Sequence, residues 1–178
     1  MRRNIATLFL QYARLDRKRG ADGLSPLEEE IWSNLRRYLG KRLNPDVPKD
    51  ADRRASLRVA TEIGCLWARS APVHDAHVTN LSRSGAFVRT PVPAPVGEEI
   101  SLRIALPEGG CIELPAVVAN QFLGADSHRR GMGVRFGPMS PETTKLIDAL
   151  YERSIIDEFG KPDETDPPLV DSSFGEPA

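Results

Sequence analysis

The amino-acid sequence predicts a mainly β protein with helical additions, in which a six-stranded antiparallel barrel lies between an N-terminal helical hairpin and a C-terminal helix. Three observations support this fold class. Apolar residues recur at helical spacing up to residue 39, and they do so again after Ser140. Between these stretches apolar and polar residues alternate, as in half-buried strands. Turn residues divide this alternation into six segments.

Residues 3–19 and 25–39 are expected to form the two helices of the hairpin. In each of them apolar side chains follow at intervals of three or four residues and so share one face. Gly20 and Gly40 come after the two apolar patterns, and glycine commonly follows a last helical turn, so we expect both helices to end there. Each apolar stripe is narrow and must be buried against another surface. The rest of the chain, a protein partner or a second copy in a homodimer could supply it.

Ser25, Pro26 and Glu28 mark the start of the second helix. A serine at the cap position and a glutamate three residues later can each accept a hydrogen bond from the other's backbone N–H, an arrangement called a capping box. Proline suits the first helical position because it has no N–H to leave unsatisfied. These residues predict a helix that begins at Pro26.

Six alternating segments between residues 59 and 136 predict the strands. The inward-facing residues of the first, fourth and fifth segments are expected to be Val59, Thr61, Ile63, Cys65 and Trp67, then Ile100, Leu102, Ile104 and Leu106, then Ile112, Leu114, Ala116 and Val118. The second and third segments flank the sequence NLSRSG, PEGG at 107–110 is typical of a hairpin turn, and GMGVRF forms the last segment. A barrel is favoured over an open sheet because closure leaves no exposed edge.

Residues 140–157 are expected to form the C-terminal helix, with Ser140 as its cap. Its apolar face is predicted to comprise Leu146, Ile147, Leu150 and Tyr151.

The chain therefore divides into four segments. The hairpin occupies residues 1–45, a linker with two prolines occupies 46–52 and its margins, and the barrel with its helix occupies 53–157. The acidic, proline-rich tail at 158–178 has too few apolar residues to offset the entropy of ordering, so we expect it to be disordered.

Charge is unevenly distributed along the chain, although the net charge is −1. Residues 1–58 carry 14 Lys or Arg against 8 Asp or Glu, whereas residues 157–178 carry seven acids against Lys161. A basic N-terminal part favours an anionic partner. No stretch approaches the roughly 20 apolar residues that a membrane span needs, and two cysteines do not make a disulfide scaffold. We therefore expect a cytoplasmic protein.

Two short motifs flank the first two predicted strands. Arg54 and Arg58 lie in RRASLR before the first strand, and Asn80, Ser82 and Gly85 lie in NLSRSGAF at the turn after the second. A guanidinium fork can pair with the O6 and N7 edge of a guanine or with a phosphate. An asparagine amide both donates and accepts hydrogen bonds, and glycine lets a backbone approach a ligand closely or take a positive φ. Together the motifs favour a compact anionic ligand with guanine edges.

RxxxR followed by [DN]xSxxG, 22 residues from Arg58 to Asn80 and ahead of a six-stranded barrel, resembles the PilZ domain family. The members of this family are bacterial receptors for cyclic di-GMP. The resemblance covers about residues 53–157, includes GVRF in the last strand, and leaves out the hairpin and the tail. Asn80 stands where many members have aspartate, which the pattern equally accepts.

The resemblance implies a role for each motif residue. Five residues would hold the ligand, namely Arg54, Arg58, Asn80, Ser82 and Gly85. The two arginines would contact guanine edges and phosphates from a mobile arm. The asparagine would bind a guanine edge, the serine a phosphate or base oxygen, and the glycine would permit close approach. Two arginines outside the fixed positions, Arg53 and Arg83, are secondary candidates, and the first could stack on a base.

The residues favour binding over catalysis. The sequence has no nucleophile–base signature and no Gly-rich phosphate loop, and nothing beyond the ligand implies a cofactor. We expect no metal site, because His74 and His77 lie three apart on a strand and would point to opposite faces.

The sequence therefore predicts an effector that binds cyclic di-GMP and converts binding into a conformational or partner-binding change. Two alternatives are a ligand-independent interaction module and a nucleic-acid-binding protein. The basic hairpin would carry the second alternative, but acids at 28–30 offset its charge and no recognition helix is evident.

Overall fold

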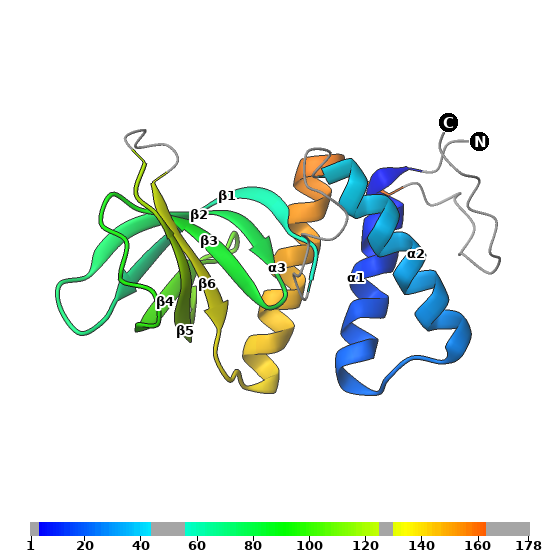
Figure 1. The fold of residues 1–178 in the computed structure, drawn as a ribbon, viewed down its shortest axis with the longest axis horizontal. Helices are drawn as coiled ribbons and strands as arrows, with labels where there is room; N and C mark the ends of the chain where they lie inside the picture. The colour runs from blue at the N-terminus through cyan, green and yellow to red at the C-terminus, as the bar shows by residue number, and fades with distance from the viewer. Residues whose placement is uncertain (1–3, 44–55, 125–129, 163–178) are drawn as a thin grey trace. The chain divides into compact units, whose positions relative to one another are not determined.

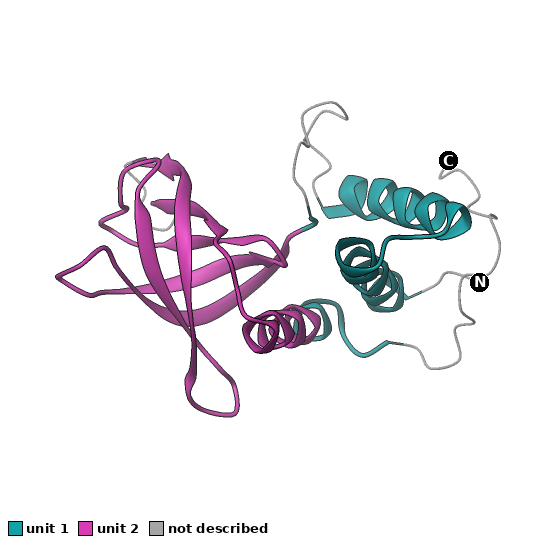
Figure 2. Cartoon of the chain, turned by 90° about the horizontal axis from the view of Figure 1, so that it is seen from below, with its two compact units in different colours: residues 1–57, 155–178 teal, residues 58–154 magenta. Residues whose placement is uncertain are grey.

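The computed structural model of the chain describes residues 4–43, 56–124 and 130–162. These residues form three helices and six strands (Figure 1). They divide into two compact units, one of residues 1–57 with 155–178 and one of residues 58–154 (Figure 2). The predicted linker at 46–52 and the part of the predicted tail beyond residue 162 lie outside the described residues.

The second unit is a closed, six-stranded antiparallel barrel, as predicted (Figure 1). Its strands are β1 (Val59–Ala68), β2 (His74–Ser82), β3 (Gly85–Arg89), β4 (Glu99–Ala105), β5 (Cys111–Phe122) and β6 (Gly131–Phe136). Around the barrel they follow the order β1-β2-β3-β6-β5-β4, and β4 closes it by pairing with β1. Every strand pair is antiparallel.

Alternating apolar residues fill the barrel interior. On β4 and β5 the register places Leu102 opposite Leu114 and Ile104 opposite Ile112, and all four side chains are buried. The residues between them point to solvent, which is why these two strands show the clearest alternation in the sequence. Cys65 belongs to the same interior, and burial raises the pKa of its thiol to about 12.

Helix α3 (Pro141–Phe159) follows the barrel and is capped as predicted, because the Thr143 N–H donates to Ser140 Oγ at 3.1 Å. Its buried stripe lacks Leu146 of the expected face and extends further, to Ser154 and Ile155. Leu146 is 42% exposed, whereas the stripe runs through Ile147, Leu150, Tyr151, Ser154 and Ile155. These positions keep a spacing of three and four residues, and Leu146 falls at the margin of the stripe. The helix also continues two residues past the expected end.

The first unit contains the predicted hairpin, formed by α1 (Ile5–Ala21) and α2 (Pro26–Leu43). The capping box is present, since the Ser25 N–H donates to Glu28 Oε2 at 2.9 Å and the Glu28 N–H donates to Ser25 Oγ at 3.3 Å. None of the helices that the structure describes is long and apolar enough to cross a lipid bilayer.

The prediction that Gly20 and Gly40 end the two helices is wrong, because both lie within helical segments. A glycine typically ends a helix when it takes a positive φ, and neither of these two does, so both helices continue through them. A Cβ atom at position 40 would lie 3.9 Å from the side chain of Leu57, an ordinary van der Waals distance, so this contact does not require glycine. Leu57 is only 2% exposed.

A buried polar chain joins the parts of the first unit. The Leu57 N–H donates to the Tyr12 hydroxyl at 3.2 Å, and that hydroxyl donates to Asp16 Oδ1 at 3.4 Å. The same carboxylate oxygen accepts a hydrogen bond from Trp32 Nε1 at 3.1 Å. Burial, more than any other effect, raises the pKa of Tyr12, so the hydroxyl stays protonated. The residue just before Arg58 is thereby fixed to α1.

Candidate functional site

The NLSRSG motif forms the tight connection between β2 and β3. Ser82 and Gly85 are paired across the ladder, so the turn consists of Arg83 and Ser84 alone. Ser82 is a buried residue that is only 2% exposed. Its hydroxyl donates a hydrogen bond to the Gly85 carbonyl at 3.0 Å. The Ser84 carbonyl accepts a hydrogen bond from the Phe136 N–H at 3.0 Å, which fastens the turn to β6. In the described structure Ser82 therefore stabilises the turn itself.

Gly85 is required by the sheet. A Cβ atom at this position would collide with the carbonyl oxygen of Val134 on β6 and would lie 3.4 Å from the Cα of Arg135. Gly85 does not have a positive φ, which was one of the two uses expected of it. Its missing side chain instead allows the end of β3 to lie close against β6.

Asn80 lies between two irregularities in the sheet. The β1–β2 register shifts between Ala60 and Ile63, and the β2–β3 register shifts between Val78 and Asn80. β-Bulges of this kind re-aim the neighbouring side chains and are common beside functional sites. Asn80 pairs with Ala60 on one side and Phe87 on the other, and it is half-buried at the approach to the turn.

Arg58 directly precedes β1. In the β1–β2 ladder Val59 lies opposite Leu81, so continuing the register by one residue brings Arg58 opposite Ser82. The end of RxxxR and the [DN]xSxxG turn therefore meet at one end of the barrel. Arg53 and Arg54 lie outside the described residues, so the structure says nothing of their positions.

Arg83 contacts a residue that the sequence did not single out. Its Nε donates to Asp148 Oδ1 on α3 at 2.6 Å, and the two side chains are only 17% and 8% exposed. Asp148 follows the turn by 65 residues, so no local pattern could have revealed the pair. The only sequence signal was an acidic residue within the apolar pattern of the C-terminal helix.

A family model of the PilZ domain matches residues 52–153, which is more than half of the chain. The chain belongs to the PilZ domain family. A comparison with curated proteins finds no match.

Solved structures with similar folds include MotI (DgrA), an inhibitor of motility from Bacillus subtilis, at 21% identity and a TM-score of 0.51 over 63% of this chain and 57% of that one. The PilZ domain of YcgR from Escherichia coli, determined with c-di-GMP, has 15% identity and a TM-score of 0.46 over 60% of this chain and 96% of that domain. The PilZ domain of CeSA from a cellulose-synthesizing bacterium has 21% identity and a TM-score of 0.44 over 54% and 95%. The chain thus spans 57% of the length of MotI, and the likeness to MotI supports the fold.

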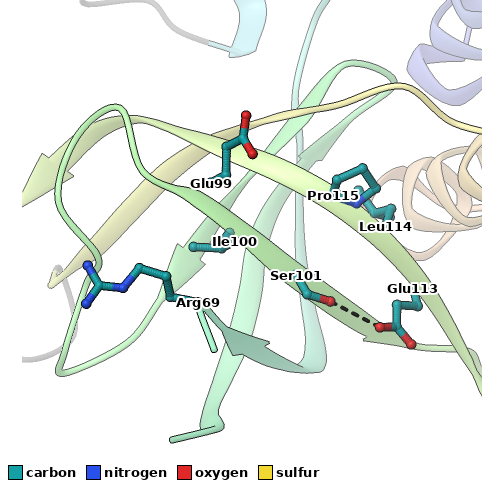
Figure 3. A pocket seen from close by; sticks show the side chains of 7 residues that line it. All are labelled: Arg69, Glu99, Ile100, Ser101, Glu113, Leu114 and Pro115. Atoms are coloured by element: carbon teal, nitrogen blue, oxygen red, sulfur yellow. Dashed lines mark hydrogen bonds between the residues drawn. The ribbon is translucent and has the colours of Figure 1, made fainter. Parts of the chain in front are cut away.

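A shallow hollow of about 400 Å³ lies elsewhere on this PilZ barrel (Figure 3). Its lining comes from the residue after β1 and from β4 and β5, namely Arg69, Glu99, Ile100, Ser101, Glu113, Leu114 and Pro115. Ser101 donates to Glu113 at 3.2 Å within it. It contains no residue of either PilZ motif, so we do not assign the ligand to it.

The basic residues of the hairpin are partly neutralised. Lys18 pairs with Glu28 at 2.6 Å and Arg19 with Glu29 at 3.1 Å. The Arg19 guanidinium also lies 4.2 Å from the centroid of the Trp32 ring. These contacts between α1 and α2 use charges that a nucleic-acid-binding surface would present to phosphates, so they do not favour that alternative.

Proposed function

We propose that this chain is a receptor for cyclic di-GMP, which it binds at the end of the barrel where Arg58 meets the NLSRSG turn. The observation that carries the proposal is the register of β1 and β2, in which Val59 lies opposite Leu81, so that its continuation by one residue would bring the last arginine of RxxxR opposite Ser82. Membership of the PilZ domain family supports it.

The chemistry of the site suits this ligand. Cyclic di-GMP offers two guanine edges and two phosphates, and arginine pairs with the O6 and N7 acceptors of guanine in a bidentate manner. Arg54 and Arg58 would supply these guanidinium groups, and Asn80 would supply a group that can both donate and accept. Adenine has an amino group in place of O6, so the same arginines would discriminate against cyclic di-AMP.

The proposed activity is ligand binding that changes the hairpin, and it involves no catalysis. Leu57, hydrogen-bonded to Tyr12, directly precedes Arg58 in the chain. A ligand that engages Arg58 therefore acts on a segment that is anchored in the hairpin. We propose that binding changes the arrangement or partner contacts of the hairpin, which makes the protein an effector.

Isothermal titration calorimetry on the full chain tests which nucleotide is the ligand. We expect saturable binding of cyclic di-GMP and at least tenfold weaker binding of cyclic di-AMP, GTP and GMP, since these lack either the second guanine edge or the O6 acceptors. Equal affinity for cyclic di-AMP would contradict guanine recognition. Absence of binding by a folded protein would favour a ligand-independent interaction module.

A further inference from the structure

The two-residue turn within the NLSRSG motif has a backbone conformation that is unusual for a tight hairpin. Two-residue hairpin turns are favoured when their residues have positive φ, because that backbone twist matches the twist of the strands. Neither Arg83 nor Ser84 has a positive φ. The turn therefore lacks the backbone conformation that best matches the twist of β2 and β3, so contacts from outside the hairpin can add to the Ser82–Gly85 hydrogen bond in fixing its direction.

Helix α3 supplies such a contact through Asp148. The carboxylate accepts a hydrogen bond from Arg83 Nε at 2.6 Å, in surroundings where the side chains are 17% and 8% exposed. A charge-assisted hydrogen bond of this kind is stronger than a neutral one. Moving Arg83 to a ligand phosphate would remove this partner from a largely buried carboxylate, which is unfavourable.

The same helix makes a second contact with the scaffold of the site. The hydroxyls of Ser154 and Thr61 lie 3.3 Å apart, and Ser154 also donates to the Leu150 carbonyl at 2.9 Å. Thr61 lies in the irregular part of β1, between the paired residues Ala60 and Ile63. Helix α3 thus contacts both the turn and the bulge that flank Asn80.

We propose that Asp148 is a positioning residue for cyclic dinucleotide binding: it holds Arg83 and thereby sets the direction of the turn that follows Asn80 and Ser82 at the end of β2. In this role Asp148 acts through Arg83, and Arg83 holds the turn instead of contacting the ligand. The inference rests on the proposed function, because the turn is taken to be part of the cyclic di-GMP site.

Three variants test the proposal by titration with cyclic di-GMP: Asp148→Asn, Arg83→Gln and the double variant. Asp148→Asn replaces the carboxylate with a neutral amide of the same size, and Arg83→Gln replaces the guanidinium with a shorter neutral amide, so each removes the ion pair. We expect each single variant to bind about tenfold more weakly than the unmodified chain, and the double variant to bind no more weakly than the singles, because all three lose the same contact. Glu113→Gln is the matched control. It removes a carboxylate from an exposed pair with Arg103 at 3.0 Å and should leave the affinity unchanged.

The outcomes separate the two roles of Arg83. If Arg83 contacts the ligand directly, Arg83→Gln weakens binding while Asp148→Asn leaves it unchanged or strengthens it, and this result would overturn the proposal. Unchanged affinity in all variants would overturn it as well. Hydrogen exchange of the amides at 82–86 in the free protein gives a readout that does not need the ligand. We expect faster exchange in Asp148→Asn, and unchanged exchange would contradict the positioning role even if the unmodified chain failed to bind cyclic di-GMP.

Discussion

At the scale of single residues, the glycine of the NLSRSG motif has a structural task that can be measured without ligand. A Cβ at position 85 would collide with the Val134 carbonyl, and the nearest atoms are all backbone atoms of β6, which leaves little room to relax. We expect Gly85→Ala to lower the free energy of unfolding by about 1–3 kcal/mol, the usual cost of overpacking. Urea unfolding followed by circular dichroism measures this.

Gly64 on β1 offers a matched control. A Cβ at position 64 meets no heavy atom within 4 Å, so Gly64→Ala should leave stability unchanged or raise it by up to about 1 kcal/mol, since glycine weakens strands. Equal destabilisation by the two substitutions would contradict the close packing of β3 against β6.

Arg58 is the described residue on which ligand affinity should depend most directly. A bidentate arginine pair with guanine contributes about 1–3 kcal/mol, so Arg58→Ala should weaken cyclic di-GMP binding by about tenfold to a hundredfold. Arg54→Ala should act similarly. Arg69→Ala is the control, because Arg69 follows the other end of β1 and pairs with Glu98 at 3.3 Å. If Arg58→Ala unfolds the protein, its role is structural.

At the scale of elements, the start of α2 should make the stability of the hairpin depend on pH. The hydrogen bond from Lys18, followed by those from the Ser25 backbone and side chain, lowers the pKa of Glu28 from 4.5 to about 2. A carboxyl with a depressed folded-state pKa stabilises the fold fully above its unfolded pKa and loses this contribution as the pH falls through the folded value.

The comparison of the unmodified chain with Glu28→Gln isolates this contribution. We expect the unmodified chain to be more stable at pH 7, and the difference to shrink between about pH 4.5 and pH 2 until it vanishes. Added salt should also reduce the difference, because the pair with Lys18 is partly exposed. A difference that stays constant with pH would show that the charge of Glu28 does not matter.

Local patterns predicted the elements well where local interactions decide them. Alternation along β4 and β5 follows from burial of every second side chain, and the Ser25–Glu28 capping box lies within four residues. Gly20 and Gly40 were misjudged because a glycine typically ends a helix by taking the left-handed conformation, and neither has a positive φ. The Arg83–Asp148 pair and the bulges beside Asn80 also depend on packing between distant segments, which a single sequence does not reveal.

At the scale of the whole molecule, two chain segments belong to both units. Leu57 is anchored to Tyr12 and is followed directly by Arg58. Helix α3 contacts Thr61 through Ser154, while the ring of Phe159 at its end packs on Phe9 with centroids 5.8 Å apart. A ligand held by Arg58 and the β2–β3 turn would act on the Leu57–Arg58 segment and on α3. Through these two segments, ligand binding could change the hairpin as proposed.

Spin labels test whether ligand binding changes the arrangement of the units. Cys111 is exposed and can be labelled directly, whereas the buried Cys65, with its raised pKa, should remain unreactive. Ser33→Cys, at an exposed position on α2, provides the second label. We expect the distance distribution to change at saturating cyclic di-GMP. An unchanged distribution with normal affinity would rule out transmission through the hairpin.

The two tryptophans lie in different surroundings, so their fluorescence can report on the two units separately. Trp32 lies in the hairpin beside Tyr12, with its indole N–H on Asp16 and the Arg19 guanidinium over its ring. Trp67 lies in the barrel, hydrogen-bonded to Thr90 and stacked on His74 with centroids 4.3 Å apart. Each unit therefore carries one tryptophan in a distinct environment. Trp67→Phe and Trp32→Phe would let the emission of one unit at a time be followed, without any attached dye.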